Sequence, residues 1–209
     1  MSLVTAEQQT RIAEAIAEVE RHTDAELVTV IAAASDDYRY IPLLWAALAA
    51  LIVPALLYFT PLYEQGPLYL FWAQAGVFVA LALALSLSAF RVRLIPRAVR
   101  EWRASNMACR QFLEQGLHHT EGETGVLIFV SEAEHFVEIL VDRGISALVE
   151  DDAWREIVAD FIGEVRAGRV EAGLTHAIER CGEILARTVP KTEGNTNELD
   201  NRLILIGYE

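Results

Sequence analysis

The sequence predicts an α/β fold, a sandwich in which a small central sheet is covered by helices, interrupted by a two-helix transmembrane hairpin. Apolar runs typical of strands alternate with the 3–4 spacing of amphipathic helices on both sides of a long apolar stretch. The 209 residues carry a formal charge of −13, yet their mean hydropathy is +0.27. Glu64 is the only charged residue between Ile41 and Phe90, so the charge and the hydropathy come from different parts of the chain.

The composition excludes several classes of protein. A hydrophobic fraction of 53% is too high for a disordered chain. Two cysteines, Cys109 and Cys181, are too few for a disulfide-stapled secreted module, and we expect both to be reduced and structural. An isoelectric point near 4.8 argues against nucleic acid as a partner.

The apolar stretch, residues 41–90, is long enough for two membrane spans. Residues 41–59 and 68–90 are uncharged, and about 20 helical residues cross a hydrocarbon core of about 30 Å. The connection 60–67 contains two prolines, a glycine and Glu64, which favour a turn in water. The alternative is a pair of buried helices in a soluble core, but a domain this small cannot enclose two such helices on every side.

Arginines immediately after the second span set the expected orientation. Six of them oppose a single acidic residue, Glu101: Arg91, Arg93, Arg97, Arg100, Arg103 and Arg110. Positive flanks remain in the cytoplasm, so the sequence predicts a bacterial inner-membrane protein with both termini cytoplasmic. We expect anionic lipids near Arg91, Arg93, Arg97, Arg100 and Arg103. A DNA or RNA role for this run is the less economical interpretation. Residues 1–40 show no cleavable signal pattern.

The first 40 residues are too few to fold alone, so we expect them to complete a domain with residues 91–189. Thr5 and Gln8 fit a capping box that opens a helix ending near His22. Residues 27–33 then read as a mostly buried strand. Residues 190–209 form a polar linker with a short apolar segment, 203–206, that is expected to add an edge strand or dock on the core.

The sequence pattern after the arginines predicts two more strands and three helices. A helix is expected from Trp102 towards Leu117. Residues 126–130 are a continuous apolar run typical of a central strand, and 136–142 alternate like an antiparallel neighbour, with a turn at Gly144. Two helices follow, one opened by an acidic pair and ended by Gly168, the other ended before Pro190. Their apolar stripes are Trp154, Ile157, Val158, Phe161, Ile162 and Val165, then Leu174, Ala177, Ile178, Cys181, Ile184 and Leu185.

These segments together resemble the TPM domain family. The likeness lies in AELVTV at 25–30, TGVLIFV at 124–130, VEILVDRGI at 137–145, and GRVEAGLTHAI at 168–178. It covers both soluble parts, and it implies a compact α/β sandwich that is often tethered to a membrane. Membership implies roles around membrane protein complexes; acid phosphatase activity and divalent-metal binding are attributed to some members.

The resemblance raises the possibility of a divalent-cation site. Many members have Asp-Asn-Gly-Val before the second core strand, where this chain has Glu123-Thr124-Gly125-Val126, and the longer Glu arm moves the carboxylate. Ca²⁺ or Mg²⁺ requires several converging oxygens, and Asp36, Asp37 and Glu123 are the candidate ligands. Further carboxylates are Glu121 and residues 150–152. The alternative is a solvated acidic rim with an acidic helix start.

Other chemistries find little support in the sequence. His118 and His119 are adjacent and cannot chelate together from a regular helix, so a zinc site with Glu121 or His135 is a weak alternative. No nucleophile-elbow, Cys-x5-Arg or phosphate-binding glycine motif is present, so no catalytic residue can be named.

The function predicted is therefore that of an accessory, assembly or stabilising factor of a membrane protein complex, and the sequence favours a non-enzymatic role. Small residues in the apolar stretch, such as Ala46 and Ala50, offer lateral packing to membrane partners. The alternative is a divalent-metal-dependent phosphatase at the membrane surface. Neither the partner complex nor any substrate follows from the sequence.

Overall fold

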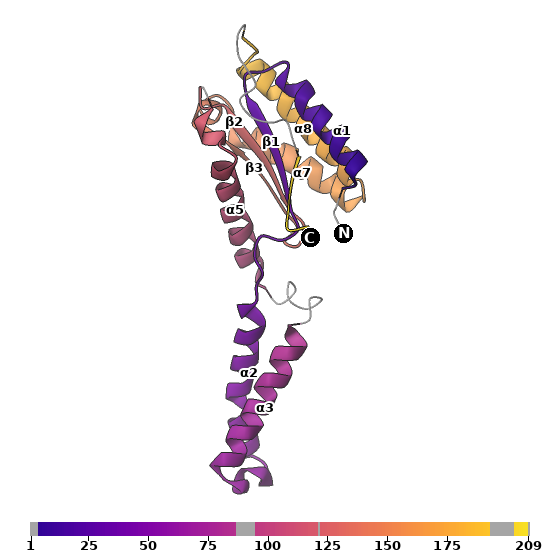
Figure 1. The fold of residues 1–209 in the computed structure, drawn as a ribbon. Coiled ribbons are helices and arrows are strands. Elements are labelled where there is room, and N and C mark those ends of the chain that lie inside the picture. The colour runs from indigo at the N-terminus through magenta and orange to yellow at the C-terminus, as the bar shows by residue number, and fades with distance from the viewer. Residues whose placement is uncertain (1–3, 87–94, 121, 193–202, 209) are drawn as a thin grey trace. The chain divides into compact units, whose positions relative to one another are not determined.

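The computed structural model describes residues 4–86, 95–120, 122–192 and 203–208 (Figure 1). Contacts divide the chain into two compact units, which we call the sheet unit (Met1–Ser35 with Glu101–Glu209) and the hairpin unit (Asp36–Arg100). The elements in order are α1 (Ala6–Glu20), β1 (Glu26–Ala32), α2 (Tyr40–Tyr58), the 3-10 helix η1 (Pro61–Gln65), α3 (Pro67–Leu85), α5 (Arg97–Glu114), the 3-10 helix η3 (Leu117–His119), β2 (Gly125–Ser131), β3 (Phe136–Val141), α6 (Arg143–Ser146), α7 (Asp151–Arg166), α8 (Val170–Thr188) and β4 (Leu203–Ile206).

The sheet has four strands in the order β3-β2-β1-β4. β1 pairs in parallel with β2 and with β4, whereas β2 and β3 are antiparallel. Every residue of β1 and β2 is buried, as expected for the two inner strands of a sheet covered on both faces. The predicted α/β sandwich is confirmed: the strands expected near 27–33, 126–130 and 136–142 are present, and 203–206 is an edge strand.

The two faces of the sheet are covered unequally. α1, α7 and α8 pack on one face, where Ile12, Ile16 and Ile178 enclose Leu27 and Ile128 in the larger core (Figure 1). Among the described residues, helix α5 and Leu117 of η3 cover the other face. There Ala104 and Ala108 are fully buried against Val28, Val30 and Phe129, because the small side chains let the helix approach the strands closely.

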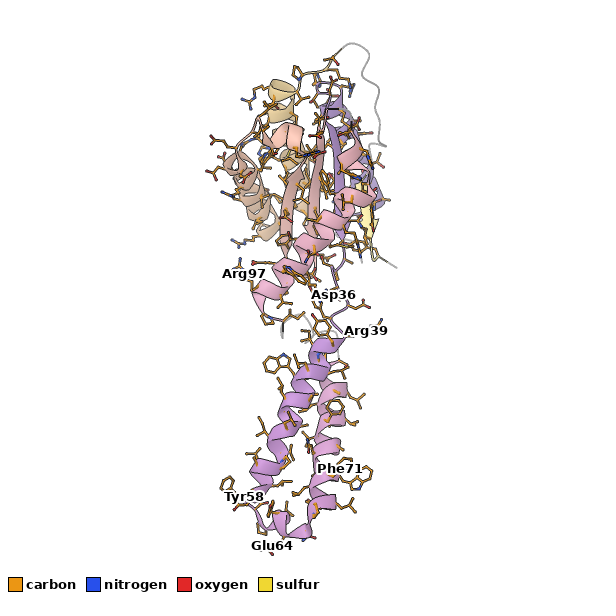
Figure 2. The ribbon with its side chains drawn as sticks, turned by 90° about the vertical axis from the view of Figure 1, so that its left-hand side faces the viewer. Asp36, Arg39, Tyr58, Glu64, Phe71 and Arg97 are labelled. Carbon is orange, nitrogen blue, oxygen red and sulfur yellow. The ribbon has the colours of Figure 1, made fainter. Side chains whose placement is uncertain are left out.

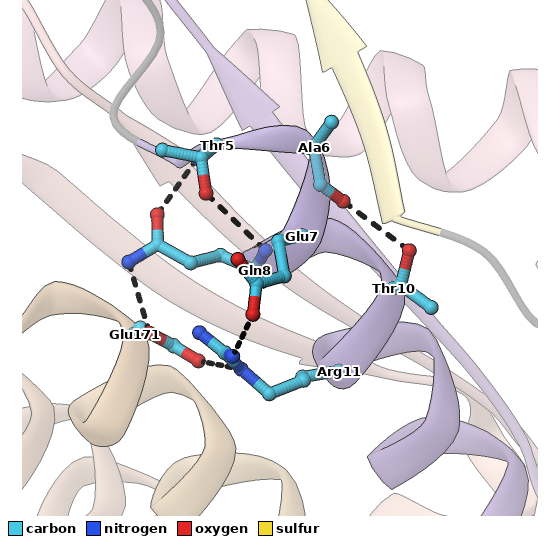
Figure 3. A network of polar contacts seen from close by, with 7 residues as sticks. All are labelled: Thr5, Ala6, Glu7, Gln8, Thr10, Arg11 and Glu171. Atoms are coloured by element: carbon cyan, nitrogen blue, oxygen red, sulfur yellow. Dashed lines mark hydrogen bonds and ion pairs between the residues drawn. The ribbon is translucent and has the colours of Figure 1, made fainter.

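Helices α1 and α8 are joined by polar contacts as well as by the core (Figure 3). The predicted capping box is present: Gln8 N donates to Thr5 Oγ1, and Thr5 N donates to Gln8 Oε1 at 2.7 Å. Gln8 Nε2 also donates to Glu171 at 2.9 Å, and Arg11 forms an ion pair with the same carboxylate. The start of α1 is therefore fixed to the start of α8.

Two local predictions differ from the structure. Gly144 is not in a plain turn but inside α6, whose first N–H is capped by Asp142. A Cβ on Gly144 would lie 2.3 Å from the carbonyl oxygen of Gly122, so only glycine permits this approach. The helix expected to run towards Leu117 ends at Glu114, since Gly116 adopts a left-handed conformation with φ of 77° and a 3-10 turn follows.

The hairpin unit contains the two predicted apolar helices. α2 and α3 have 19 residues each and are long and apolar enough to cross a membrane. In the most apolar stretch of α2, 22% of the residues are buried within the described chain, and in that of α3 none are. Tyr58 and Glu64 lie at the connected end of the hairpin, where η1 forms the connection (Figure 2). Residues 87–90 of the predicted second span, and Arg91 and Arg93, lie outside the described residues.

Candidate functional site

The carboxyl ends of β1, β2 and β4 lie at one edge of the sheet, because the three strands are parallel. In open α/β sheets ligands usually bind at this edge, so a functional site is expected among the residues that follow these strands. They are residues 33–35 after β1, 132–135 after β2, and 207–208 after β4.

A buried carboxylate connects two of these segments. Glu134 is 5% exposed, and its Oε1 and Oε2 accept hydrogen bonds from the backbone N–H of Ser35 at 3.2 and 3.1 Å. Ser131 Oγ also donates to Glu134, and the Ser35 and Ser131 hydroxyls lie 2.7 Å apart. The turn after β2 thus holds the segment that leads from β1 towards α2. We call Ser35, Ser131 and Glu134 the strand-end clamp.

The surrounding contacts reinforce the strand-end clamp. Backbone bonds join Glu132 N to Ala32 O at 2.9 Å and Ala133 N to Ala33 O at 3.1 Å. The Tyr208 hydroxyl, which follows β4, donates to Glu132 Oε2 at 2.9 Å. Within the described residues neither serine is hydrogen-bonded to a histidine: the two hydroxyls lie within hydrogen-bond distance of each other, and Ser131 Oγ donates to Glu134. The geometry of the clamp is that of a positioning device.

The structure does not gather the three predicted metal ligands. β1 and β2 are in parallel register, so Glu123 precedes the end where these strands start, whereas Asp36 and Asp37 follow the end where β1 finishes. A seven-residue strand separates these two ends by about 20 Å. Within the described residues no group of three or more His, Cys, Asp or Glu side chains could hold a metal ion.

Each predicted ligand instead has a local contact. Asp36 Oδ1 accepts from the Tyr38 N–H at 3.3 Å, and Asp37 lies 3.2 Å from the Arg39 guanidinium. Glu123 has a positive φ of 57° and binds Arg143 Nη2 at 2.6 Å. The carboxylates at the start of α7 act similarly: Asp151 and Asp152 both pair with Arg155. Glu121 lies outside the described residues.

The neighbouring histidines differ from the expectation for a regular helix. His118 and His119 lie in the 3-10 turn η3, and their ring centroids are only 3.8 Å apart. The two rings lie side by side because η3 is a 3-10 turn and not the regular helix expected from the sequence. The two rings still belong to no metal-binding group of three among the residues that the structure describes.

A second buried carboxylate, Glu20, was not singled out by the sequence. It is 8% exposed at the end of α1, and its Oε1 accepts from the Leu27 N–H at 2.9 Å. Burial raises the pKa of Glu20 from 4.5 to about 8. The nearby Glu26 also raises this pKa, while the Leu27 N–H and Lys191 lower it. The sequence does carry a pattern that indicates burial of Glu20: it follows Ile12 and Ile16 at a spacing of four residues, so it continues the apolar stripe of the helix.

Comparison with known proteins supports the domain assignment. The model of the TPM domain family matches residues 88–184, which confirms the resemblance found in the sequence. The BA42 protein of the psychrophilic bacterium Bizionia argentinensis, solved by NMR, has a similar structure, with a TM-score of 0.62 and 19% sequence identity. That alignment covers 98% of this chain and 96% of the BA42 chain. At this identity the likeness shows the fold alone. No curated protein sequence matches the chain.

Proposed function

Because the chain carries a TPM domain, we propose that it is a TPM domain protein anchored in the bacterial inner membrane by α2 and α3. It acts as a non-enzymatic accessory, assembly or stabilising factor of a membrane protein complex. The observation that carries the anchoring is the exposure of the hairpin side chains, which no other part of the described residues covers.

The hairpin exposes large apolar side chains along both helices. Leu51 and Leu56 on α2 are each 65% exposed, and Leu68, Trp72 and Leu83 on α3 are 71%, 65% and 69% exposed. Transfer of one such side chain from water to an apolar environment contributes about 1.5–3 kcal/mol. A bilayer supplies that environment along the whole length of each helix, whereas a soluble state would leave these side chains in water.

The arginines support an orientation with both termini in the cytoplasm. Arg97, Arg100 and Arg103 belong to α5, which begins shortly after the second apolar helix. Trp102 is 60% exposed beside them, and the Arg103 guanidinium carbon lies 5.0 Å from the centroid of its ring. Exposed tryptophan beside arginine is typical of a segment at the lipid headgroups, so we include anionic lipids among the ligands, with Arg91 and Arg93 extending the basic run.

The orientation has a direct test in intact cells. Position 65 is in the connection between the helices, and Cys109 is exposed on α5. A membrane-impermeant maleimide added from the periplasm should label Gln65→Cys and leave Cys109 unlabelled. Labelling of Cys109, but not of position 65, would invert the topology. Labelling of both without membrane disruption would show that the hairpin does not span.

The accessory role predicts a stable assembly in the membrane. The tagged full-length protein, solubilised in a mild detergent, should purify with a larger complex and bring the same membrane proteins in repeated preparations. Purification only as a monomer or homo-oligomer in several gentle detergents would contradict the role. A parallel purification of a hairpin-deleted protein separates partners held by the membrane helices from partners held by the sheet unit.

The alternative, a divalent-metal-dependent phosphatase, has less support because Glu123 precedes the start of β2 whereas Asp36 and Asp37 follow the end of β1, and the two strands are parallel. The two proposals separate in one assay. Hydrolysis of a generic phosphate ester that requires Ca²⁺ or Mg²⁺ and is lost in Asp37→Asn would establish the phosphatase. Absence of turnover together with an unchanged melting temperature on cation addition would leave the accessory role.

A further inference from the structure

A groove lies between β3, the end strand of the sheet, and helix α7. It consists of two hollows of about 520 and 340 Å³, and Val137 lines both of them. The larger hollow lies between the start of β3 and the end of α7, where Phe161, Ile162 and Val165 line it. The smaller hollow lies between the rest of β3 and the start of α7, where Trp154 and Val158 line it.

The dimensions of the groove suit an extended segment of about six residues. The twelve residues of α7 from Trp154 to Val165 span about 17 Å, and the six residues of β3 span about 17–20 Å. On β3, Val137, Ile139 and Val141 pack on the larger core yet stay partly exposed. α7 therefore leaves an apolar strip of this strand uncovered.

β3 also offers an open backbone edge. It pairs only with β2, and no further backbone hydrogen bond from residues 136–141 is found in the part of the chain that the structure describes. An unpaired strand edge is a template for another strand. This edge distinguishes a peptide from a small apolar ligand, because only a peptide supplies a matching row of N–H and C=O groups.

The charges differ between the two ends of the groove. Arg155, at the smaller hollow, is neutralised by Asp151 and Asp152. Arg166, at the larger hollow, forms no ion pair with any residue that the structure describes, whereas Glu132 in the same hollow accepts a hydrogen bond from Tyr208. The larger hollow thus has an apolar lining, a cation without an ion pair among the described residues (Arg166) and a carboxylate (Glu132) that keeps its charge. An acidic side chain of an occupant can pair with Arg166 at this end.

A buried donor lies at the opposite end. Trp154 is 5% exposed, and its indole Nε1 has no hydrogen-bond partner among the described residues. A buried N–H without an acceptor is unfavourable, but this atom is closed to solvent, so it is not counted among the contacts of an occupant.

We propose that this groove binds an extended segment of a partner protein, which adds as a strand beside β3. The segment places apolar side chains at alternate positions against α7 and an acidic side chain opposite Arg166. The inference rests on the proposed function only in taking the occupant to be a protein of the membrane complex. The groove, its open strand edge and its charge stand independently of that role.

The test begins with the full-length protein in its native membrane. The photoreactive residue p-benzoylphenylalanine replaces Ile162 or Val165, both partly exposed in the groove, and Leu148, which is 62% exposed outside it, serves as the control. Illumination should yield an adduct from the groove positions alone. Mass spectrometry should place it in a partner segment with alternating apolar residues and an acidic residue. No adduct, an adduct with a second copy of the chain, or one within a membrane helix would overturn the proposal.

The cross-linked segment is then synthesised and its binding measured with purified variants. Ile162→Asp should weaken binding about tenfold or more, and Arg166→Gln by about three- to tenfold, because each removes one proposed contact. Arg187→Gln is the matched control, since both arginines lie in the last turn of a helix. Equal affinity for Ile162→Asp and the wild type would exclude the groove. If the complex still co-purifies with Ile162→Asp and no groove adduct forms, the accessory role survives and this inference fails.

Discussion

Glu20 makes the stability of the sheet unit depend on pH in a way that a single substitution should remove. Its carboxyl group is buried, and burial raises its pKa from 4.5 to about 8. The folded protein therefore retains the proton up to about pH 8, whereas the unfolded chain releases it near pH 4.5. Between these values the folded state binds more protons than the unfolded state, so the free energy of unfolding falls as pH rises.

The magnitude follows from the size of the shift. One pKa unit corresponds to about 1.36 kcal/mol, so the stabilisation from the protonated group, complete below pH 4.5, decreases by on the order of 4 kcal/mol between pH 5 and pH 8.5. Glu20→Gln keeps an acceptor for the Leu27 N–H and cannot ionise. We therefore expect the variant to match the wild type near pH 5 and to exceed its stability at pH 8.5.

Urea unfolding of the full-length protein in a mild detergent measures this difference. Of the four tryptophans in the chain, all of them among the described residues, Trp154 is the one that is buried, so the change in fluorescence on unfolding comes mainly from its exposure as α7 leaves the core. Glu14→Gln is the control, because Glu14 is an exposed residue of the same helix. If the unfolding free energies of wild type and Glu20→Gln change in parallel from pH 5 to pH 8.5, Glu20 does not hold its proton in the folded state.

Three further predictions concern packing and reactivity. Gly182→Ala should destabilise the sheet unit by about 1–3 kcal/mol in the same urea assay, because the added Cβ would lie 2.5 Å from a valine methyl of α1. Gly163→Ala should stabilise it by about 0.5–1 kcal/mol, because the added Cβ meets nothing within 4 Å. Maleimide should modify exposed Cys109 in the native protein, while buried Cys181, whose thiol pKa burial raises to about 12, should react only after unfolding; modification of both at equal rates would contradict the core. Glu134→Ala should cost about 1–3 kcal/mol, because the part-buried Ser35 N–H loses its acceptor and Ser131 Oγ loses a charged partner; an unchanged urea midpoint would show that the strand-end clamp is not a stabilising contact.

Most helices and strands could be predicted from the sequence because each one has a local cause. The run 126–130 is apolar at every position because β2 is buried on both faces. The hairpin was evident because Glu64 is the only charge in fifty residues, a pattern that no amphipathic helix produces. The Gly116 break was missed because a left-handed glycine inside an otherwise helical pattern changes no periodicity.

The candidate site was harder to predict from the sequence, because it depends on the order and direction of the strands. The grouping of Asp36 and Asp37 with Glu123 requires the end of one strand to meet the beginning of the next, and the parallel register of β1 and β2 separates those positions. Parallel pairing is a property of the whole topology, and neither strand sequence by itself shows the direction of its neighbour. Glu134 was detectable in principle, because it follows a buried apolar strand by three residues, at the edge where parallel strands end.

The position of the hairpin in the chain has a topological reason. Two parallel neighbours such as β1 and β2 cannot be joined by a tight turn, so the chain must cross over through a long connection, usually a helix. Helix α5 provides that crossover, and the hairpin is inserted between the end of β1 and the start of α5. The insertion therefore lengthens a connection that must already be long, and every strand pairing of the sheet remains possible without it.

This reasoning predicts that the sheet unit folds without its anchor. Replacement of residues 37–95 with a twelve-residue Gly/Ser linker, whose ends lie about 20 Å apart on average, keeps the strand-end clamp and all of α5. The product should be soluble without detergent, unfold cooperatively in urea, and protect Cys181 from maleimide as the full-length protein does. Reaction of Cys181 at the rate of the unfolded chain would refute the crossover argument, because it would mean that the sheet unit needs the hairpin in order to fold.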